Sequence, residues 1–181
     1  MDTVGPRGRL FIAAELPESI VRAAAQYADL LEASFPGRYV PAQNYHVTLA
    51  FLGLTPLVAI RDLDQAVTEA LCGIAPCTCA LAKPGAFGKQ HSAIVWAGLT
   101  NSEYLAGLAR RIRRELDIRG FSYDTKPARP HITLARGVDL TGRRLPPLPE
   151  ASGEISKVAV FQSMRRDGAL IYLPEVAISL G

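Results

Sequence analysis

Residues 46–50 read His-Val-Thr-Leu-Ala, and residues 131–135 read His-Ile-Thr-Leu-Ala. The two stretches lie 85 positions apart, and the same offset places the apolar run 10–13 on the apolar run 95–98. Because self-similarity at a fixed offset is typical of repeated structural units, the chain is predicted to contain a duplicated unit.

Each copy of the unit has the pattern of a strand, a helix and a second strand. In the first copy, residues 9–15 have strand character, and apolar residues then recur at helical spacing over 20–31. In the second copy, residues 93–99 and 105–116 repeat that order. The histidine-containing stretch that closes each copy is rich in Val, Ile, Thr and Leu, which favours a strand.

The segments outside the repeat complete the expected fold. Helical periodicity recurs over 60–71, residues 77–81 have strand character, and the proline-rich stretch 137–153 is predicted to be a loop. Residues 155–161 and 169–178 are predicted to be strands joined by a turn at Asp167-Gly168.

We therefore expect an α/β (α+β) fold that is bilobal and duplicated. It would have two mainly antiparallel sheets, flanking helices and a central cleft. The two pseudo-symmetric lobes would form on the approximate repeat units 9–53 and 94–138, within a single domain that spans residues 1–181.

Composition narrows the class of protein. With 49% hydrophobic and 20% charged residues, the chain has the composition of a folded globular domain. No apolar run approaches the roughly 20 residues that cross a bilayer, and residues 1–9 lack the features of a signal peptide. A cytoplasmic monomer without a membrane partner is expected. Residues 105–166 carry 13 Lys/Arg against 6 Asp/Glu, which is compatible with a polyanionic partner such as nucleic acid.

The cysteines give little reason to expect a metal or a disulfide. Cys72, Cys77 and Cys79 are odd in number, and no export signal accompanies them. A zinc site that recruits His91 would lack the paired spacing of structural zinc sites. We therefore expect reduced thiols, no metal site, and His91 at the surface of a loop.

The repeated histidines are the candidate catalytic residues. Residues two apart on a strand share a face, so His46 projects with Thr48 and His131 with Thr133. A single H-x-T segment is more often a structural polar pair, but the duplication places two of the three histidines at equivalent positions. One imidazole can accept a proton while the other donates one, and the hydroxyls can stabilise charge on a phosphate between them. No cofactor is then required.

The two motifs resemble those of the 2H phosphoesterase superfamily. The similarity extends over residues 9–136, and the stretches around 44–53 and 129–136 are similar to the bacterial and archaeal RNA 2′,3′-cyclic phosphodiesterases, also described as 2′-5′ RNA ligases. The resemblance implies hydrolysis of a terminal 2′,3′-cyclic phosphate on RNA to a 2′-phosphate, and reversibility as 2′-5′ ligation. It also implies that His46 is the proton donor and His131 the proton acceptor.

Other residues near the motifs can be interpreted either as ligand-binding or as structural residues. Arg129 and Arg136 flank the second motif and are candidate phosphate ligands beside Thr48 and Thr133, although solvated arginines are as common. Phe11 and Trp96 occupy equivalent apolar strands and are expected in the core.

Two alternative functions stay open. The same chemistry suits a small cyclic nucleotide phosphate or a 2′-5′ oligonucleotide. A non-catalytic RNA-binding module is the alternative from another class, but such a module does not need two titratable rings.

Overall fold

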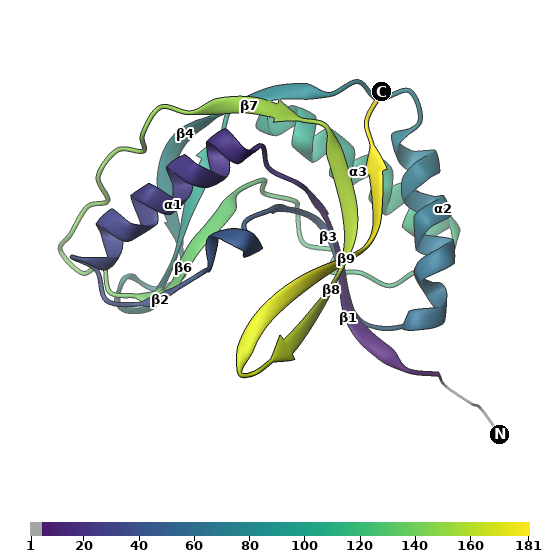
Figure 1. The fold of residues 1–181 in the computed structure, drawn as a ribbon, viewed down its shortest axis with the longest axis horizontal. Helices are drawn as coiled ribbons and strands as arrows, with labels where there is room; N and C mark the ends of the chain where they lie inside the picture. Colours follow the sequence, from purple (N-terminus) through teal and green to yellow (C-terminus); the bar gives the residue numbers. More distant parts are fainter. Residues whose placement is uncertain (1–4) are drawn as a thin grey trace.

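The structure is a computed structural model that describes residues 5–181 (Figure 1). The stretch 1–9, in which we expect no export signal, begins with four residues that lie outside this part of the chain. Among residues 5–181, no helix combines the length and the apolar character needed to cross a membrane.

The elements follow the predicted order of strands and helices. They are β1 (Arg7–Ala14), α1 (Glu18–Glu32), β2 (Arg38–Tyr39), β3 (Val47–Pro56), α2 (Ile60–Leu71), β4 (Cys77–Phe87), β5 (Ala93–Leu99), α3 (Ser102–Ile118), β6 (Ile132–Val138), β7 (Ser152–Ile155), β8 (Lys157–Arg166) and β9 (Ala169–Ser179), with 3-10 turns η1 (Ala42–Asn44), η2 (Leu57–Ala59) and η3 (Gln90–Ser92). The offset of 85 relates β1 to β5, α1 to α3 and β3 to β6, so the strand–helix–strand order of each copy is confirmed.

The strands form a curled antiparallel sheet with a symmetric order. Its main path runs β7-β4-β5-β6-β3-β1-β8-β9, and the short β2 pairs with β6. About the central β6–β3 step, β5 corresponds to β1, β4 to β8 and β7 to β9. The predicted α/β class with antiparallel strands and flanking helices is confirmed. We call β7, β4, β5 and β6 one half-sheet and β3, β1, β8 and β9 the other. The two half-sheets meet edge to edge where Val47 of β3 pairs with Ile132 of β6.

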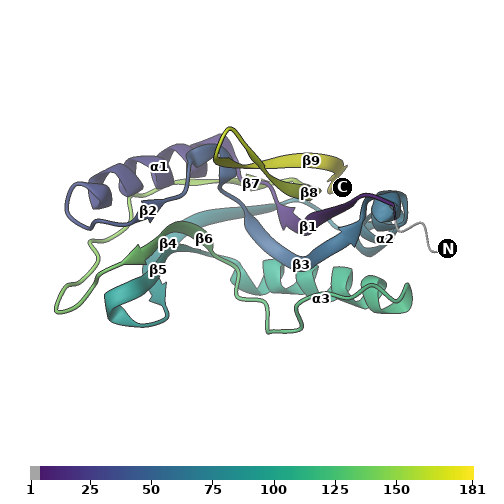
Figure 2. The same cartoon turned by 90° about the horizontal axis from the view of Figure 1, so that it is seen from below.

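The helices of the two copies cover opposite halves of this sheet. Helix α1 contacts β6 and β7, which belong to the half-sheet that contains the second copy's strands. Helix α3 contacts β3 and α2, on the half-sheet of the first copy. Figure 2 shows α1 and α3 on opposite sides of the molecule. Each copy therefore contributes its strands to one half and its helix to the other.

Buried apolar stripes hold these helices in place. The predicted stripe of α1, including Ile20, Tyr27 and Leu31, is buried, and so is the stripe of α3 from Leu105 to Leu116. Burial of apolar area at about 25 cal/mol per Å² is the main stabilising contribution at such contacts. The sheet and helices thus share one hydrophobic core.

The C-terminal hairpin agrees with the prediction and extends it. Strands β8 and β9 pair from Lys157 to Arg166, and the turn residues Asp167 and Gly168 have φ of 51° and 82°. Positive φ at both central residues is the geometry of a two-residue hairpin turn, which explains the Asp-Gly sequence. Three elements differ from expectation. Strand β4 continues to Phe87 past an irregularity between Leu81 and Pro84, and the two-residue β2 has no periodic pattern that could predict it. Strand β7 begins at Ser152, within the predicted loop, because residues 77–80 of β4 pair with it, and it ends before β8 begins at Lys157.

Candidate active site

The two histidines stand at the junction of the half-sheets. His46 and His131 each lie one residue before a strand, rather than within it as predicted, because the ladder begins at Val47 and Ile132. Extending the antiparallel register by one residue sets His46 facing Thr133 and His131 facing Thr48. All four side chains fall at alternate positions and so share one face of the sheet.

A backbone carbonyl orients each imidazole in the same way. Nδ1–H of His46 donates to the carbonyl oxygen of Asn44 at 2.7 Å, and Nδ1–H of His131 donates to the carbonyl oxygen of Arg129. Because a carbonyl can only accept, Nδ1 carries a hydrogen in both rings, and Nε2 is the nitrogen left free to gain or lose a proton. Thr48 Oγ1 lies 3.1 Å from His46 Nε2 and can donate to it when the ring is neutral.

The surroundings lower the pKa of both imidazoles. Burial is the main cause for each ring, and the carbonyl hydrogen bonds oppose it in part. Arg136 lowers both pKa values further, and His131 also lowers the pKa of His46. The effect of His131 on the pKa of His46 is consistent with two rings that lie close together at the junction.

Aromatic rings pack against each histidine. The Phe11 ring centroid lies 4.9 Å from that of His46 and 5.3 Å from that of Phe161, against which it stacks. On the other half-sheet, the His131 ring centroid lies 6.2 Å from that of Trp96 and 5.0 Å from that of Phe87.

These contacts refine the prediction that Phe11 and Trp96 are core residues. Phe11 is buried and Trp96 half-buried, but each also contacts the histidine of its own half-sheet. The indole crosses β4 at Gly85, where an added Cβ would lie 2.1 Å from the ring. The offset of 85 relates Phe11 to Trp96, and this signal could have identified both as supports of the imidazoles.

A cavity of about 630 Å³ opens beside the histidine junction. Its lining includes the predicted residues His46, Thr48, Thr133 and Arg136, together with Phe51, whose side chain is 39% exposed. The other lining residues are Phe11, Arg38, Tyr39, Val40, Pro41, Asn44, Ser163, Arg165, Gly168, Ala169, Leu170 and Tyr172. No carboxylate lines this cavity, so it favours an anionic ligand.

Three predicted residues, His131, Arg129 and His91, lie outside the cavity lining. His131 is half-buried at the junction, where it faces Thr48 across the extended register. Arg129 is exposed, with its guanidinium carbon 6.0 Å from the centre of the Phe87 ring, and its carbonyl orients His131. His91 is exposed in η3, which agrees with the surface position expected for it.

Sequence reasoning missed Arg38, Arg165 and Tyr172. Arg38 lies on the two-residue β2, and the other two lie on the β8–β9 hairpin. The Tyr172 ring is 5.2 Å from the His46 ring in an edge-on arrangement, and burial raises the pKa of its hydroxyl. Arg165 and Tyr172 lie outside both repeat units, and the offset relates Arg38 to Tyr123 rather than to a second arginine, so it gave no signal for the three.

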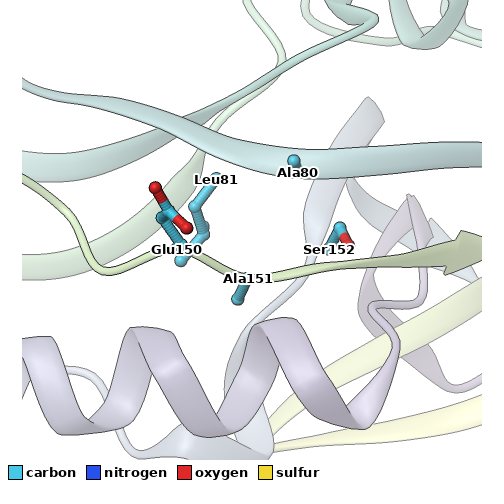
Figure 3. Close-up of a pocket in the computed structure, with 5 residues that line it drawn as sticks. All are labelled: Ala80, Leu81, Glu150, Ala151 and Ser152. Atoms are coloured by element: carbon cyan, nitrogen blue, oxygen red, sulfur yellow. The ribbon is translucent and has the colours of Figure 1, made fainter.

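Two other features of the described chain, the cysteines and a smaller hollow, lack the paired histidines of this site. Cys72, Cys77 and Cys79 are free thiols, and residues 5–181 hold no group of three or more His, Cys, Asp or Glu placed to bind a metal ion. The smaller hollow has a volume of about 370 Å³. Figure 3 shows the residues that line it, Ala80, Leu81, Glu150, Ala151 and Ser152. Glu150 is the one titratable side chain in its lining, so this hollow lacks a paired acid and base.

A curled antiparallel sheet with an H-x-T segment from each half at its centre defines the class of 2H phosphoesterases. The family model for the 2′-5′ RNA ligase superfamily matches residues 16–167, and the chain belongs to this superfamily. The resemblance found in the sequence is thereby confirmed.

Relatives in several bacteria carry the name RNA 2′,3′-cyclic phosphodiesterase. The Geobacillus stearothermophilus protein is 35% identical over 132 residues, which are 72% of this chain and 42% of that protein. The Thermus thermophilus protein is 35% identical over 137 residues, covering 71% of this chain and 68% of the relative. The Escherichia coli protein is 29% identical over 170 residues, covering 92% and 93%. The chain thus spans less than half the length of the Geobacillus relative and nearly all of the E. coli one.

Solved structures share the fold over almost the whole chain. E. coli LigT complexed with 3′-AMP superposes with a TM-score of 0.82 at 27% identity, covering 97% of this chain and 99% of that chain. The fold of the present chain is therefore that of a LigT-like phosphoesterase.

Proposed function

We propose that the protein hydrolyses the terminal 2′,3′-cyclic phosphate of RNA to a 2′-phosphate by metal-independent acid–base catalysis. The observation that carries the proposal is the junction at Val47 and Ile132, which brings two carbonyl-oriented imidazoles to one face beside an anion-favouring cavity. The names of the relatives support the same activity.

The proposed roles follow the resemblance and fit the orientation of the rings. Nε2 of His131 takes a proton from the attacking water, whose oxygen forms a bond to phosphorus. The bond between phosphorus and the 3′ oxygen breaks, and protonated His46 gives its Nε2 proton to that oxygen. The products are a 2′-phosphate and a 3′-hydroxyl, and proton exchange with solvent restores the two rings.

Charge on the phosphate is stabilised by donors on both half-sheets. Thr48 and Thr133 are placed to donate hydroxyl hydrogen bonds to the non-bridging oxygens, and Arg136 adds a positive charge in the same cavity. Arg129, outside the cavity lining, is proposed as a contact to RNA beyond the reacting group. A 5′-hydroxyl in the place of water would give a 2′-5′ linkage through the same proton transfers.

We treat the two sequence units, 9–53 and 94–138, as pseudo-symmetric lobes of one domain. The symmetric strand order about the β6–β3 step supports this description. The monomeric state and cytoplasmic location stay predictions from the sequence.

The test is product analysis on an RNA that ends in a 2′,3′-cyclic phosphate, in the presence of a chelator. The expected product is the 2′-phosphate alone. A 3′-phosphate product would reject the assignment of the leaving oxygen. No reaction on RNA, with turnover of a nucleoside cyclic phosphate or a 2′-5′ oligonucleotide, would favour the small-substrate alternative. Binding of RNA without any turnover would favour the non-catalytic alternative.

A further inference from the structure

The cavity carries more positive charge than one phosphate requires. Arg38, Arg136 and Arg165 all line it, and no carboxylate does. Within residues 5–181, none of these three guanidiniums forms an ion pair, whereas Arg22 and Arg119 elsewhere in the chain pair with glutamates. The three cavity arginines therefore have charge that the folded protein leaves uncompensated.

Two of these arginines are held side by side by strand pairing. Arg38 on β2 is the register partner of Arg136 on β6. Directly opposed residues of an antiparallel pair project to the same face with Cβ atoms roughly 5 Å apart, and like charges in that position are destabilising. An anion bound between or beside the two guanidiniums would remove this repulsion.

The third arginine reaches the cavity from the opposite half-sheet. Arg165 is near the end of β8, and its Nη1 donates a long hydrogen bond of 3.4 Å to the carbonyl oxygen of Gly168 at the turn. The hairpin is tied to the histidine segment because Asn44 Nδ2 donates to the carbonyl oxygen of Leu170 at 2.8 Å. Arg165 and Arg166 are consecutive on the strand, and Arg166 does not line the cavity.

We propose that Arg38 and Arg165 form a binding site for a second phosphate, distinct from the one at the histidines. This inference rests on the proposed function. The cyclic phosphate closes the 2′ and 3′ positions of the last nucleotide, so the neighbouring phosphate in RNA is the diester on its 5′ side. Arg38 and Arg165 hold this diester while Arg136 serves the cyclic phosphate, and the enzyme consequently prefers an oligonucleotide end to a free nucleoside cyclic phosphate.

Three substrates with the same terminal nucleoside test the site on the wild-type protein. They are a nucleoside 2′,3′-cyclic phosphate with a free 5′-hydroxyl, a dinucleotide that ends in the same cyclic phosphate, and that dinucleotide with a neutral methylphosphonate linkage. Loss of a charge-assisted hydrogen bond costs about tenfold, so kcat/KM for the natural dinucleotide should exceed the other two by about that factor or more.

Three variants assign the preference to residues. Arg38→Gln and Arg165→Gln should each lower the ratio of dinucleotide to mononucleoside kcat/KM by about fivefold to tenfold, the range expected when one guanidinium contact to phosphate is lost. Arg166→Gln is the matched control, because it removes the same charge from the next residue of the hairpin and should keep the wild-type ratio.

The possible outcomes distinguish failure of the second phosphate site from failure of the proposed function. Equal kcat/KM for all three substrates, or a dinucleotide preference that survives the methylphosphonate linkage, would overturn the second phosphate site. An unchanged ratio in both Arg38→Gln and Arg165→Gln would also overturn it. If the wild-type protein turned over none of the substrates, the proposed function itself would fall, which is a different result from turnover without discrimination.

Discussion

Val47 and Ile132 form the residue pair through which β3 and β6 join, and each of them directly follows a histidine. Both side chains are fully buried, so the pair is fixed by the core on the opposite face of the sheet. A one-residue slip of this register would turn every side chain of one strand to the other face. The apolar residues that stabilise the junction therefore also determine that both imidazoles face the cavity side.

The first prediction concerns the two histidines as a unit. His46→Ala and His131→Ala should each lower kcat about 10²–10⁴-fold, because each removes one proton-transfer group. The double variant should lose little more than either single variant, since a cooperating pair disabled by one change has little left to lose. Single-turnover rates on a cyclic-phosphate RNA measure this effect.

The third histidine supplies the matched control for that series. His91 is exposed and outside the cavity lining, so His91→Ala should keep wild-type activity. Circular dichroism and thermal unfolding of each variant exclude loss of the fold as the cause. Near wild-type turnover by a folded His46→Ala or His131→Ala protein would reject the two-histidine mechanism.

The threonines should have smaller effects than the histidines. Thr48→Ala and Thr133→Ala each remove one hydroxyl donor to the phosphate but leave both proton-transfer groups, so losses of about 10–100-fold in kcat/KM are expected. Serine at either position restores the donor and should recover most of the rate. The same loss in the serine variant as in the alanine variant would show that the hydroxyl is not the group that matters.

The pH dependence should report two lowered histidine pKa values. Burial lowers the pKa of both rings below the ordinary 6.5, and the proposed catalysis needs one ring neutral and one protonated. The profile of kcat/KM, which reflects the free enzyme, should thus be bell-shaped with its maximum on the acid side of pH 6.5. The profile of kcat reflects the enzyme–substrate complex, in which the negative phosphate raises the pKa of both rings. The maximum of the kcat profile should therefore lie at higher pH than that of kcat/KM. A rate that rises steadily with pH and then levels off would indicate a single base.

Chelation should leave the activity unchanged. In the proposed mechanism the two histidines act as acid and base, and the threonine hydroxyls and the Arg136 guanidinium stabilise charge on the phosphate, so no step is proposed to require a metal. The measurement is kcat/KM after prolonged dialysis against EDTA, followed by an assay with and without added Mg²⁺ or Mn²⁺. Activity that is lost on dialysis and restored only by a divalent cation would contradict the metal-independent mechanism.

The sequence predicted those parts of the site that belong to the repeat. His46, Thr48, His131 and Thr133 could be found because a short local motif fixes both their identity and their relative position on a strand. The crossing of α1 and α3 to opposite half-sheets could not be found, because periodicity shows which helix face is buried but not which sheet buries it.

The residues at the rim of the cavity are brought together by contacts that no local sequence pattern predicts. Arg38 lies on a strand of two residues, which is too short for a pattern. Arg165 and Tyr172 reach the cavity because the β8–β9 hairpin lies beside η1, and the hydrogen bond between Asn44 and Leu170 that ties them joins residues 126 positions apart. Such placement follows from tertiary structure rather than from propensity.

That hydrogen bond gives the last prediction. Asn44 has two separate roles, because its carbonyl orients His46 while its buried side-chain amide ties the hairpin through Leu170. Asn44→Ala keeps the carbonyl and removes the tie. Loss of the bond and the unpaired carbonyl left on Leu170 should cost about 1–3 kcal/mol of unfolding free energy. The looser hairpin should raise KM for RNA more than it lowers kcat, because the hairpin carries Arg165, which we propose to bind the substrate, while His46 stays oriented.

Asn101→Ala is the matched control for this variant. The Asn101 side chain also donates to a carbonyl, that of Thr78 at 2.7 Å, but it does not line the cavity, so its loss should leave KM unchanged. The acid and alkaline limbs of the kcat/KM profile should keep their positions in Asn44→Ala, because the carbonyl that holds Nδ1–H of His46 is still present. If those limbs moved and kcat fell while KM stayed constant, the side chain of Asn44 would be acting on His46 rather than on the hairpin.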